Sequence, residues 1–338
     1  MIILTNRYLD HSEPQIYTIH AARAFENGWR ILALGLVLVL TLPPPQFAYL
    51  PEQPFIVARD AALPPPHDAA SAQVDCGAVA VPPDADCFFT DCAGDVCTDV
   101  CIKPSPSYGD YKTAIRREYA WAFAYWRAGG PGAAAASSLP RTFFLDVGAN
   151  IGVTLVGAAR AGRRVLAFEP APVNQRYLNA TVCLNGFEQL VEVVPAAVGA
   201  KSGVVRFVEH PTRGDNSAMS AATAGLNIGG ETREVEVPLW SIDNYVARNP
   251  RWAAADCALM KIDVQGFELR VLEGAREFLR TAAAANPAFT VRAEVDARLE
   301  TSALGAAGGA EKLMGELGFE VLERSGGDVL WRPRKGVK

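Results

Sequence analysis

Short apolar runs and segments of helical periodicity alternate along the chain from residue 142 onward. The apolar runs predict strands over 142–147, 164–168, 190–195, 257–263 and 288–295. The periodic segments predict helices over 152–161, 171–185, 267–280 and 308–317. Two more strands, over 318–323 and 328–332, follow with a Ser325-Gly326-Gly327 turn between them. This alternation predicts an α/β fold with a doubly wound, mostly parallel sheet of about seven strands and an antiparallel C-terminal hairpin.

One insertion interrupts the alternation. Residues 203–208 and 233–239 each resemble strands, and a short helix over 240–246 follows them. The loop between the two strands is rich in Gly, Ser and Ala and contains His210. Loops of this length inside a domain are commonly functional. We therefore expect the insertion to recognise a substrate.

The first 50 residues contain an unbroken apolar run, Ile31 to Leu42, which ends at three prolines. The run is shorter than the roughly 20 residues of a membrane-spanning helix and is typical of a secretory signal or short signal anchor. A buried helix is the alternative. Because Gln46 is not the small residue expected before a cleavage point after Ala48, we expect residues 1–50 to be retained as a membrane anchor. The rest of the chain would then lie in the lumen of the secretory pathway or Golgi, and a cytoplasmic location is the alternative.

Residues 51–106 form a proline-rich segment that contains five of the seven cysteines: Cys76, Cys87, Cys92, Cys97 and Cys101. We expect the prolines to exclude regular structure, so that this segment is a disordered stem stapled by disulfides in an oxidising compartment. A zinc site built from the last four cysteines is the competing interpretation, although neither pair has C-x2-C spacing.

The number of stem cysteines is odd. One of the five is therefore expected to be free, to pair with the remainder of the chain or to pair with a second copy. Cys183 and Cys257 lie in the apolar pattern farther along the chain and are expected to be buried thiols.

Composition limits the class of partner. The 338 residues carry a formal net charge of -5 without a long run of Lys or Arg, which argues against nucleic acid as the main partner. Half of the residues are apolar, enough for the core of one full domain with an appendage. We place this domain at residues 107–338. It begins with a helix predicted to extend from residue 108 through Trp126 and a Gly-rich link at 129–138.

The clearest motif lies where the first strand of this domain ends. Asp146-Val-Gly148-Ala-Asn150-Ile-Gly152 is a glycine-punctuated turn that leads into a helix, and Glu169 ends the next strand. Nucleoside-binding α/β domains place an acidic residue about 20 positions beyond the first glycine, where it accepts hydrogen bonds from ribose hydroxyls. We expect the two glycines to let a ligand approach without meeting a Cβ.

The spacing within this loop distinguishes two kinds of cofactor. A dinucleotide fold uses G-x-G-x-x-G, so that a pyrophosphate sits on the helix N-terminus, whereas here Asn150 replaces the second glycine. An acidic strand end suits a ligand that carries an ammonium and a sulfonium centre. The loop therefore indicates S-adenosyl-L-methionine, with five expected contacts: Asp146, Gly148, Asn150, Gly152 and Glu169.

Four motifs occur in the order and spacing of a known family: DVGANIG at 146–152, AFEP at 167–170, KIDVQGFE at 261–268 and VLEGA at 271–275. Over residues 107–333 the chain resembles the FkbM-type methyltransferases, a branch of the class I S-adenosylmethionine-dependent enzymes. The resemblance implies the class I fold and methyl transfer. The family often has Glu at the position of Gln265, so the resemblance implies no role that needs a charge there.

Asp263 and His210 are the candidates for catalysis. Asp263 ends a strand that should open on the ligand site, and Lys261 lies on the same face because positions i and i+2 of a strand point the same way. We expect Asp263 at the methyl-transfer centre, with a structural Lys261–Asp263 ion pair as the alternative. His210 could act as general base for a hydroxyl. Glu268 opens the next helix, where a carboxylate also favours the helix dipole.

These features predict an S-adenosylmethionine-dependent methyltransferase that O-methylates a hydroxyl of a glycan or small molecule, and no residue is assigned as a metal ligand. Two alternatives stay open. A nicotinamide-dependent oxidoreductase would share the sheet, although Asn150 argues against it. A non-catalytic luminal binding protein would keep the fold, and Gln265 favours that alternative.

Overall fold

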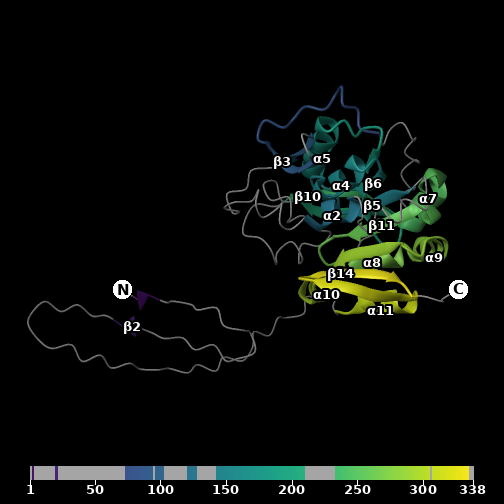
Figure 1. Ribbon diagram of the computed structural model, residues 1–338. Helices are drawn as coiled ribbons and strands as arrows, with labels where there is room; N and C mark the ends of the chain where they lie inside the picture. Colours follow the sequence, from purple (N-terminus) through teal and green to yellow (C-terminus); the bar gives the residue numbers. More distant parts are fainter. Residues whose placement is uncertain are drawn as a thin grey trace, which may run out of the picture. The chain divides into compact units, whose positions relative to one another are not determined.

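The computed structural model describes residues 2–3, 20–21, 73–93, 96–102, 120–127, 142–209, 233–304 and 307–334. The chain divides into two units, 1–55 and 56–338. In the first unit β1 (Ile2–Ile3) pairs antiparallel with β2 (His20–Ala21). The other described elements belong to the second unit (Figure 1). The apolar run at 31–42 and His210 lie outside the described residues.

The second unit is built on a seven-stranded sheet in the order β13-β14-β12-β11-β5-β6-β7. Its strands are β5 (Phe143–Val147), β6 (Arg164–Phe168), β7 (Val191–Val194), β11 (Cys257–Ile262), β12 (Thr290–Glu294), β13 (Phe319–Ser325) and β14 (Asp328–Pro333). The five strands from β12 to β7 are parallel, and β14 and β13 add an antiparallel edge. The predicted doubly wound sheet with its C-terminal hairpin is confirmed.

Helices connect these strands. They are α2 (Ala120–Trp126), α4 (Val153–Arg160), α5 (Pro172–Leu184), α7 (Ile242–Arg248), α8 (Glu268–Glu273), α9 (Arg276–Ala285), α10 (Ala297–Leu304) and α11 (Gly309–Glu316), with short 3-10 helices η2 (Pro250–Trp252) and η3 (Ala254–Asp256). The helix predicted over 267–280 is two helices, α8 and α9, and α10 was not predicted. None of the helices in the described ranges has the length and apolar character needed to cross a bilayer.

Successive residues of β5 point to opposite faces of the sheet, and both faces are covered. Phe143, Leu145 and Val147 lie in the core that also contains residues of α7, α8, α9 and α11. Phe144 lies in a second core, with residues of α2, α4 and α5. Asp146 shares the parity of Phe144, so its carboxylate is directed to the face that α2 and α4 cover.

A small second sheet carries the insertion. It contains β8 (Ala197–Val198), β9 (Gly203–Glu209) and β10 (Arg233–Trp240) in the order β8-β10-β9. Residues 210–232, which join β9 to β10, lie outside the described residues. The fully buried Glu209 accepts hydrogen bonds from the backbone N–H of Val173 (2.7 Å) and from Nε of Arg233 (2.5 Å). The base of the insertion is thus tied to the first turn of α5.

The prediction that prolines exclude regular structure from the stem is wrong for residues 86–102. There β3 (Asp86–Ala93) and β4 (Val96–Ile102) form an antiparallel hairpin, in which Cys87 lies opposite Cys101 and forms a disulfide with it. The hairpin forms because the flanking prolines, Pro82 and Pro83 before β3 and Pro104 after β4, lie outside both strands and remove no ladder hydrogen bond. The proposed zinc site is also wrong, since two of its four cysteines are joined to each other.

A second disulfide joins Cys76 to Cys183 near the end of α5. The prediction that Cys183 is a free buried thiol is therefore wrong, whereas Cys257 is free and buried as predicted. Cys76 is a stem cysteine that pairs with the remainder of the chain. The side chains of Cys92 and Cys97 lie outside those described.

Hydrogen bonds and apolar contacts reinforce this attachment. The N–H of Asp99 donates to Oδ1 of Asn185 (3.1 Å), and Nδ2 of Asn185 donates to the carbonyl of Asp99 (2.6 Å). Val74 and Val100 are buried in the core beneath α2, α4 and α5. The hairpin segment, which we define as the described residues 73–93 and 96–102, is therefore a folded part of the second unit.

Candidate active site

The sheet changes its direction of growth between β5 and β11. From β5 the chain adds β6 and β7 on one side, and it then adds β11 and β12 on the other. Open α/β sheets bind ligands outside the carboxyl ends of their strands at such a switch point. Asp146, Glu169 and Asp263 lie at the ends of β5, β6 and β11, so the structure brings together three of the residues singled out in the sequence.

The loop between β5 and α4 contains three left-handed residues: Gly148 (φ 79°), Asn150 (φ 53°) and Gly152 (φ 91°). A Cβ added to Gly148 would lie 2.0 Å from the carbonyl oxygen of Asp263, and one added to Gly152 would lie 2.8 Å from Cδ1 of Leu178. The glycines therefore make room for the protein itself, and the expectation that they also let a ligand approach stays a prediction. Their nearest neighbours are the end of β11 and the helix α5, against which the loop packs.

Glu169 is buried and holds this loop. Its Oε2 accepts the N–H of Asn150 (2.7 Å), and its Oε1 accepts the N–H of Ala171 (2.9 Å) and Nδ2 of Asn174 (3.2 Å). Burial raises the pKa of Glu169 to about 7, against the lowering effect of these donors. Since a carboxylate has about four acceptor positions, one on Oε2 stays available.

Asp146 and Lys261 form a buried ion pair at the switch point. Nζ of Lys261 lies 3.4 Å from Oδ1 of Asp146 and donates a 2.7 Å hydrogen bond to the carbonyl of Gly148. Oδ2 of Asp146 accepts the hydroxyl of Thr154 at 2.5 Å. The Asp146 side chain has no exposed surface, and its described neighbours, Lys261 and Thr154, are protein groups. Its predicted contact with a ligand ammonium stays a prediction.

Opposing effects set the charge of this pair. Burial raises the pKa of Asp146, and the Lys261 ammonium and the Thr154 hydroxyl act against that rise. Burial alone would lower the pKa of Lys261, but the carboxylates of Asp146 and Asp263 outweigh it and raise that pKa. The ammonium is therefore kept charged at neutral pH.

Charged side chains form two rows across the strand ends. The strand register aligns Lys261 with both Asp146 and Arg292, which gives a first row of one carboxylate and two cations. Glu294 lies opposite Asp328 in the register of β12 with β14, and Asp263 directly follows β11. This second row contains carboxylates alone.

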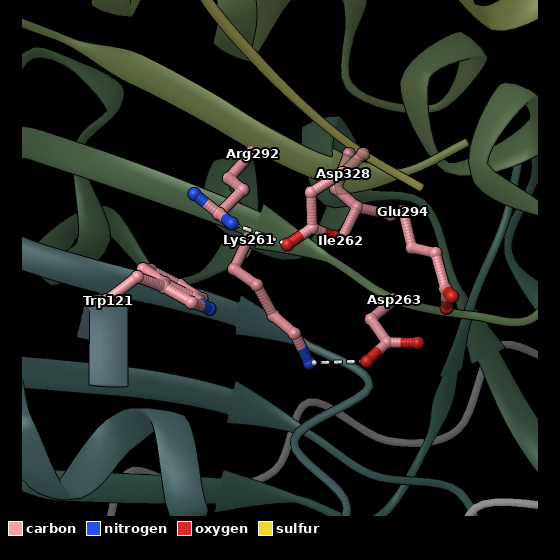
Figure 2. Close-up of a pocket in the computed structure, with 8 residues that line it drawn as sticks. Trp121, Lys261, Ile262, Asp263, Arg292, Glu294 and Asp328 are labelled. Carbon is pink, nitrogen blue, oxygen red and sulfur yellow. Dashed lines mark hydrogen bonds and ion pairs between the residues drawn. The ribbon is translucent and has the colours of Figure 1, made fainter. Parts of the chain in front are cut away.

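The two rows border a hollow of about 390 Å³, including the part open to solvent, which Figure 2 shows. It is lined by Trp121 of α2 together with Lys261, Ile262, Asp263, Arg292, Ala293, Glu294 and Asp328. Nζ of Lys261 lies 3.4 Å from Oδ2 of Asp263, and the guanidinium of Arg292 donates to Oδ2 of Asp328 at 2.5 Å (Figure 2). The predicted proximity of Lys261 and Asp263 is confirmed.

One amide nitrogen links two of the carboxylates. Nε2 of Gln265 donates to Oδ1 of Asp263 (2.9 Å) and to Oε2 of Glu294 (3.0 Å). A glutamate at this position has no N–H to donate, so glutamine is the residue that can bridge two carboxylates. The backbone of Gln265 is left-handed, with φ 55°.

Glu268 holds the turn that follows β11. Its buried Oε1 accepts the N–H groups of Val264 (3.1 Å) and Gly266 (3.2 Å) and so fixes the turn that presents Gln265. Burial raises the pKa of Glu268 to about 7.

Sequence reasoning missed Trp121, Arg292, Glu294 and Asp328 at this site. A signal for two of them existed in Thr290-Val-Arg292-Ala-Glu294, where polar residues at every second position of a central strand mark one face. The guanidinium of Arg292 lies 4.2 Å from the ring centroid of Trp121, a contact that no local pattern predicts. His210 lies outside the described residues, so its role stays a prediction.

Comparison with known proteins assigns this site to a family. Residues 146–302 match the family model described as the methyltransferase FkbM domain. Methyltransferase sdnD of Sordaria araneosa is 28% identical, and the match covers 40% of this chain and 61% of that protein. The chain therefore spans less than two thirds of this curated relative.

Two solved structures show low-scoring similarity. The methyltransferase FkbM of Methylobacillus flagellatus KT is 17% identical, with a TM-score of 0.37 over 56% of this chain and 43% of its own. Magnesium protoporphyrin IX methyltransferase (ChlM) of Synechocystis PCC 6803, solved with bound SAH, is 10% identical, with a TM-score of 0.33 over 68% and 90%. The family match and the strand order, rather than these alignments, identify the domain: residues 146–302 match the methyltransferase FkbM domain and lie on a class I methyltransferase fold.

Proposed function

We propose that the domain uses S-adenosyl-L-methionine as methyl donor and transfers the methyl group to a hydroxyl of a small molecule or glycan. The observation that carries the proposal is the meeting of the β5–α4 loop with the Glu169 carboxylate at the switch point. An adenosine-type ligand needs such a carboxylate beside a tight turn.

The residues of the loop fit this donor. Oδ1 of Asn150 is buried without a hydrogen-bond partner, and Oε2 of Glu169 keeps an acceptor position. Buried acceptors without donors are uncommon in native proteins and suit a ligand that brings hydroxyl or amino groups. Glu169 would hold the ribose hydroxyls, and the loop at 148–152 would border the nucleoside.

When bound, S-adenosylmethionine supplies an electrophilic methyl group on a sulfonium sulfur. The chain's task is to hold an acceptor oxygen in line with that methyl group, and orientation of this kind supplies much of the acceleration in two-substrate reactions. Asp263 lies beside the Gly148 turn and lines the hollow, which supports its proposed place at the transfer centre. His210 stays a proposed base from the insertion.

Gln265 supports an active site over a non-catalytic one. Its amide donates hydrogen bonds to both Asp263 and Glu294. An ionised glutamate has no side-chain hydrogen to donate and could form neither bond. The departure from the residue common in the family therefore fits the polar network of this chain and needs no loss of activity to explain it.

The two disulfides support folding in an oxidising compartment, where such bonds persist. We propose on this basis that the domain is luminal or extracellular. Non-reducing peptide mapping of protein purified from its own cells would show both cross-links, and finding all four thiols free would contradict this location.

Binding and transfer test the proposed function separately. Calorimetric titration with S-adenosylhomocysteine and with NAD should show binding of the first alone. Labelled S-adenosylmethionine should then methylate a member of a panel of neutral sugars, uronic acids, alcohols and phenols, detected as the mass gain of one methylene. Binding of NAD without binding of S-adenosylhomocysteine would contradict S-adenosyl-L-methionine as the methyl donor. Donor binding without transfer to any acceptor class would favour the luminal binding protein.

A further inference from the structure

We propose that Glu294 is the proton acceptor for the methyl acceptor's hydroxyl, held against Asp263 by the amide of Gln265, in the hollow at the ends of β11 and β12. This inference rests on the proposed methyl transfer and adds a catalytic residue to it. It also assigns the hollow to acceptors that carry no negative charge beside the reacting hydroxyl.

The cations of the hollow are engaged by other groups. Lys261 donates to the Gly148 carbonyl and is shared by Asp146 and Asp263. Arg292 donates from Nε (2.9 Å) and from its terminal nitrogen (2.5 Å) to the same oxygen of Asp328. Among the described residues no cation forms an ion pair with Glu294, which accepts a hydrogen bond from the neutral amide of Gln265.

This difference separates Glu294 from Asp263. Asp263 has an ammonium 3.4 Å from Oδ2 and an amide at Oδ1, so donors already occupy both of its oxygens. Glu294 lies in the all-carboxylate row, opposite Asp328 in the strand register and one amide nitrogen away from Asp263. A proton added there relieves repulsion among three carboxylates.

The charged groups around Glu294 support the same assignment. Burial, and then the carboxylates of Asp263, Glu268 and Asp328, raise the pKa of Glu294 to about 8. Lys261 and Arg292 are the cations that line the same hollow. A general base is most effective when its pKa lies near the working pH, because it is then both ionised in part and strongly basic.

The O–H bond of the acceptor breaks, and its proton moves to the Glu294 carboxylate. A lone pair of the acceptor oxygen forms the new O–C bond while the S–C bond breaks and its electron pair stays on sulfur, which leaves a thioether. The protonated Glu294 is stabilised by Asp263 until solvent removes the proton.

Infrared titration of the full chain without ligands tests the protonation state directly. The carboxylic-acid band that disappears as the pH rises through about 8 should lose the amplitude of one carboxyl in Glu294→Gln. The matched control Glu277→Gln, at a side chain that is 74% exposed, should keep it. Retention of the full band in Glu294→Gln would overturn the assignment.

A second variant covers the case in which Glu294→Gln does not fold. Asp263→Asn removes a carboxylate next to Glu294, so the Glu294 band should titrate at lower pH than in the wild type. An unmoved band in Asp263→Asn would contradict the coupling between the two groups.

Kinetics with the acceptor identified in the panel complete the test. Glu294→Gln should lower kcat by about 10²- to 10⁴-fold, abolish the rise of kcat with pH and leave donor affinity within a few-fold. A neutral sugar should also be methylated faster than the uronic acid of the same skeleton. Wild-type activity in Glu294→Gln would overturn the role of Glu294 alone. Wild-type protein that binds no donor would overturn the proposed function itself.

Discussion

The two halves of the sheet, divided at the switch point, hold their charged groups in different ways. In the half formed by β5, β6 and β7, the Glu169 carboxylate is held by three donors, and α5 is fixed by a disulfide. In the half formed by β11, β12 and β14, three carboxylates and two cations line an open hollow, and the cations pair with Asp263 and Asp328.

The difference separates binding from proton transfer. A half whose carboxylate is already held by backbone N–H groups can hold the methyl donor in one place, because its groups lose little conformational freedom when that donor binds. In the half with a surplus of carboxylates, Glu294 has no cation partner among the described residues and its pKa is raised to about 8, which suits proton transfer. Lys261 belongs to both halves, since it contacts Asp146 on β5 and Asp263 at the end of β11.

The largest loss of stability should come from removing the disulfide that fixes α5 in the half formed by β5, β6 and β7. Cys76→Ala/Cys183→Ala removes a disulfide that closes a loop of 107 residues, so the free energy of unfolding should fall by about 4 to 5 kcal/mol. The shorter loop of Cys87→Ala/Cys101→Ala, at a separation of 14 residues, should cost about 3 kcal/mol. Chemical denaturation compares the two, and an equal or larger loss for the second pair would contradict the order.

Lys261→Met tests the residue that contacts both halves of the sheet. It leaves the buried Asp146 without its cation, and breaking a buried ion pair in this way costs about 3 to 5 kcal/mol. Asp263→Asn should cost about 1 kcal/mol, because Asp263 is 27% exposed and asparagine keeps an acceptor oxygen. Melting curves of both variants check this. Equal losses would indicate a purely structural Lys261–Asp263 pair.

Glu169→Gln should weaken donor binding with a smaller effect on the fold. Replacing a charge-assisted hydrogen bond to the ribose by a neutral one should cost about 1 to 1.5 kcal/mol of binding free energy. Glu316→Gln, at an exposed position on α11, is the matched control. Calorimetry with S-adenosylhomocysteine that gives the wild-type affinity for Glu169→Gln would remove Glu169 from the donor site.

Gly148→Ala should affect the fold as well as binding. The added Cβ would meet the Asp263 carbonyl at 2.0 Å in a left-handed backbone, so the turn has to shift. A variant with unchanged melting temperature would contradict this packing role.

The raised pKa values predict a dependence of stability on pH. Burial raises the pKa of Glu169 and Glu268 to about 7 and that of Glu294 to about 8. A carboxyl whose pKa is raised on folding stabilises the protein below its unfolded pKa, and this contribution is lost as the pH rises through the folded pKa. The melting temperature should therefore fall between about pH 5 and pH 8. Glu294→Gln should flatten the upper part of that fall, and an unchanged slope would argue against a protonated Glu294.

The sequence by itself determined the sheet and the position of the donor loop. Apolar runs and helical periodicity are local signals, and they predicted β6 at its observed bounds and β5, α4 and α5 within a residue or two. The DVGANIG loop and Glu169 were also found from local spacing. Their meeting follows from topology, because parallel strands bring their carboxyl ends to one edge of the sheet.

Contacts between distant residues were decided by the tertiary structure alone. The pairing of Cys76 with Cys183 across 107 residues depends on where the hairpin segment docks on α5, and no local pattern specifies that position. The clash at Gly148 depends on the Asp263 carbonyl, and the state of Glu294 depends on carboxylates from three other segments. Side-chain periodicity states which face a residue occupies. Desolvation and Coulomb interactions act through space, so only the folded chain fixes the charge that each residue of this site carries.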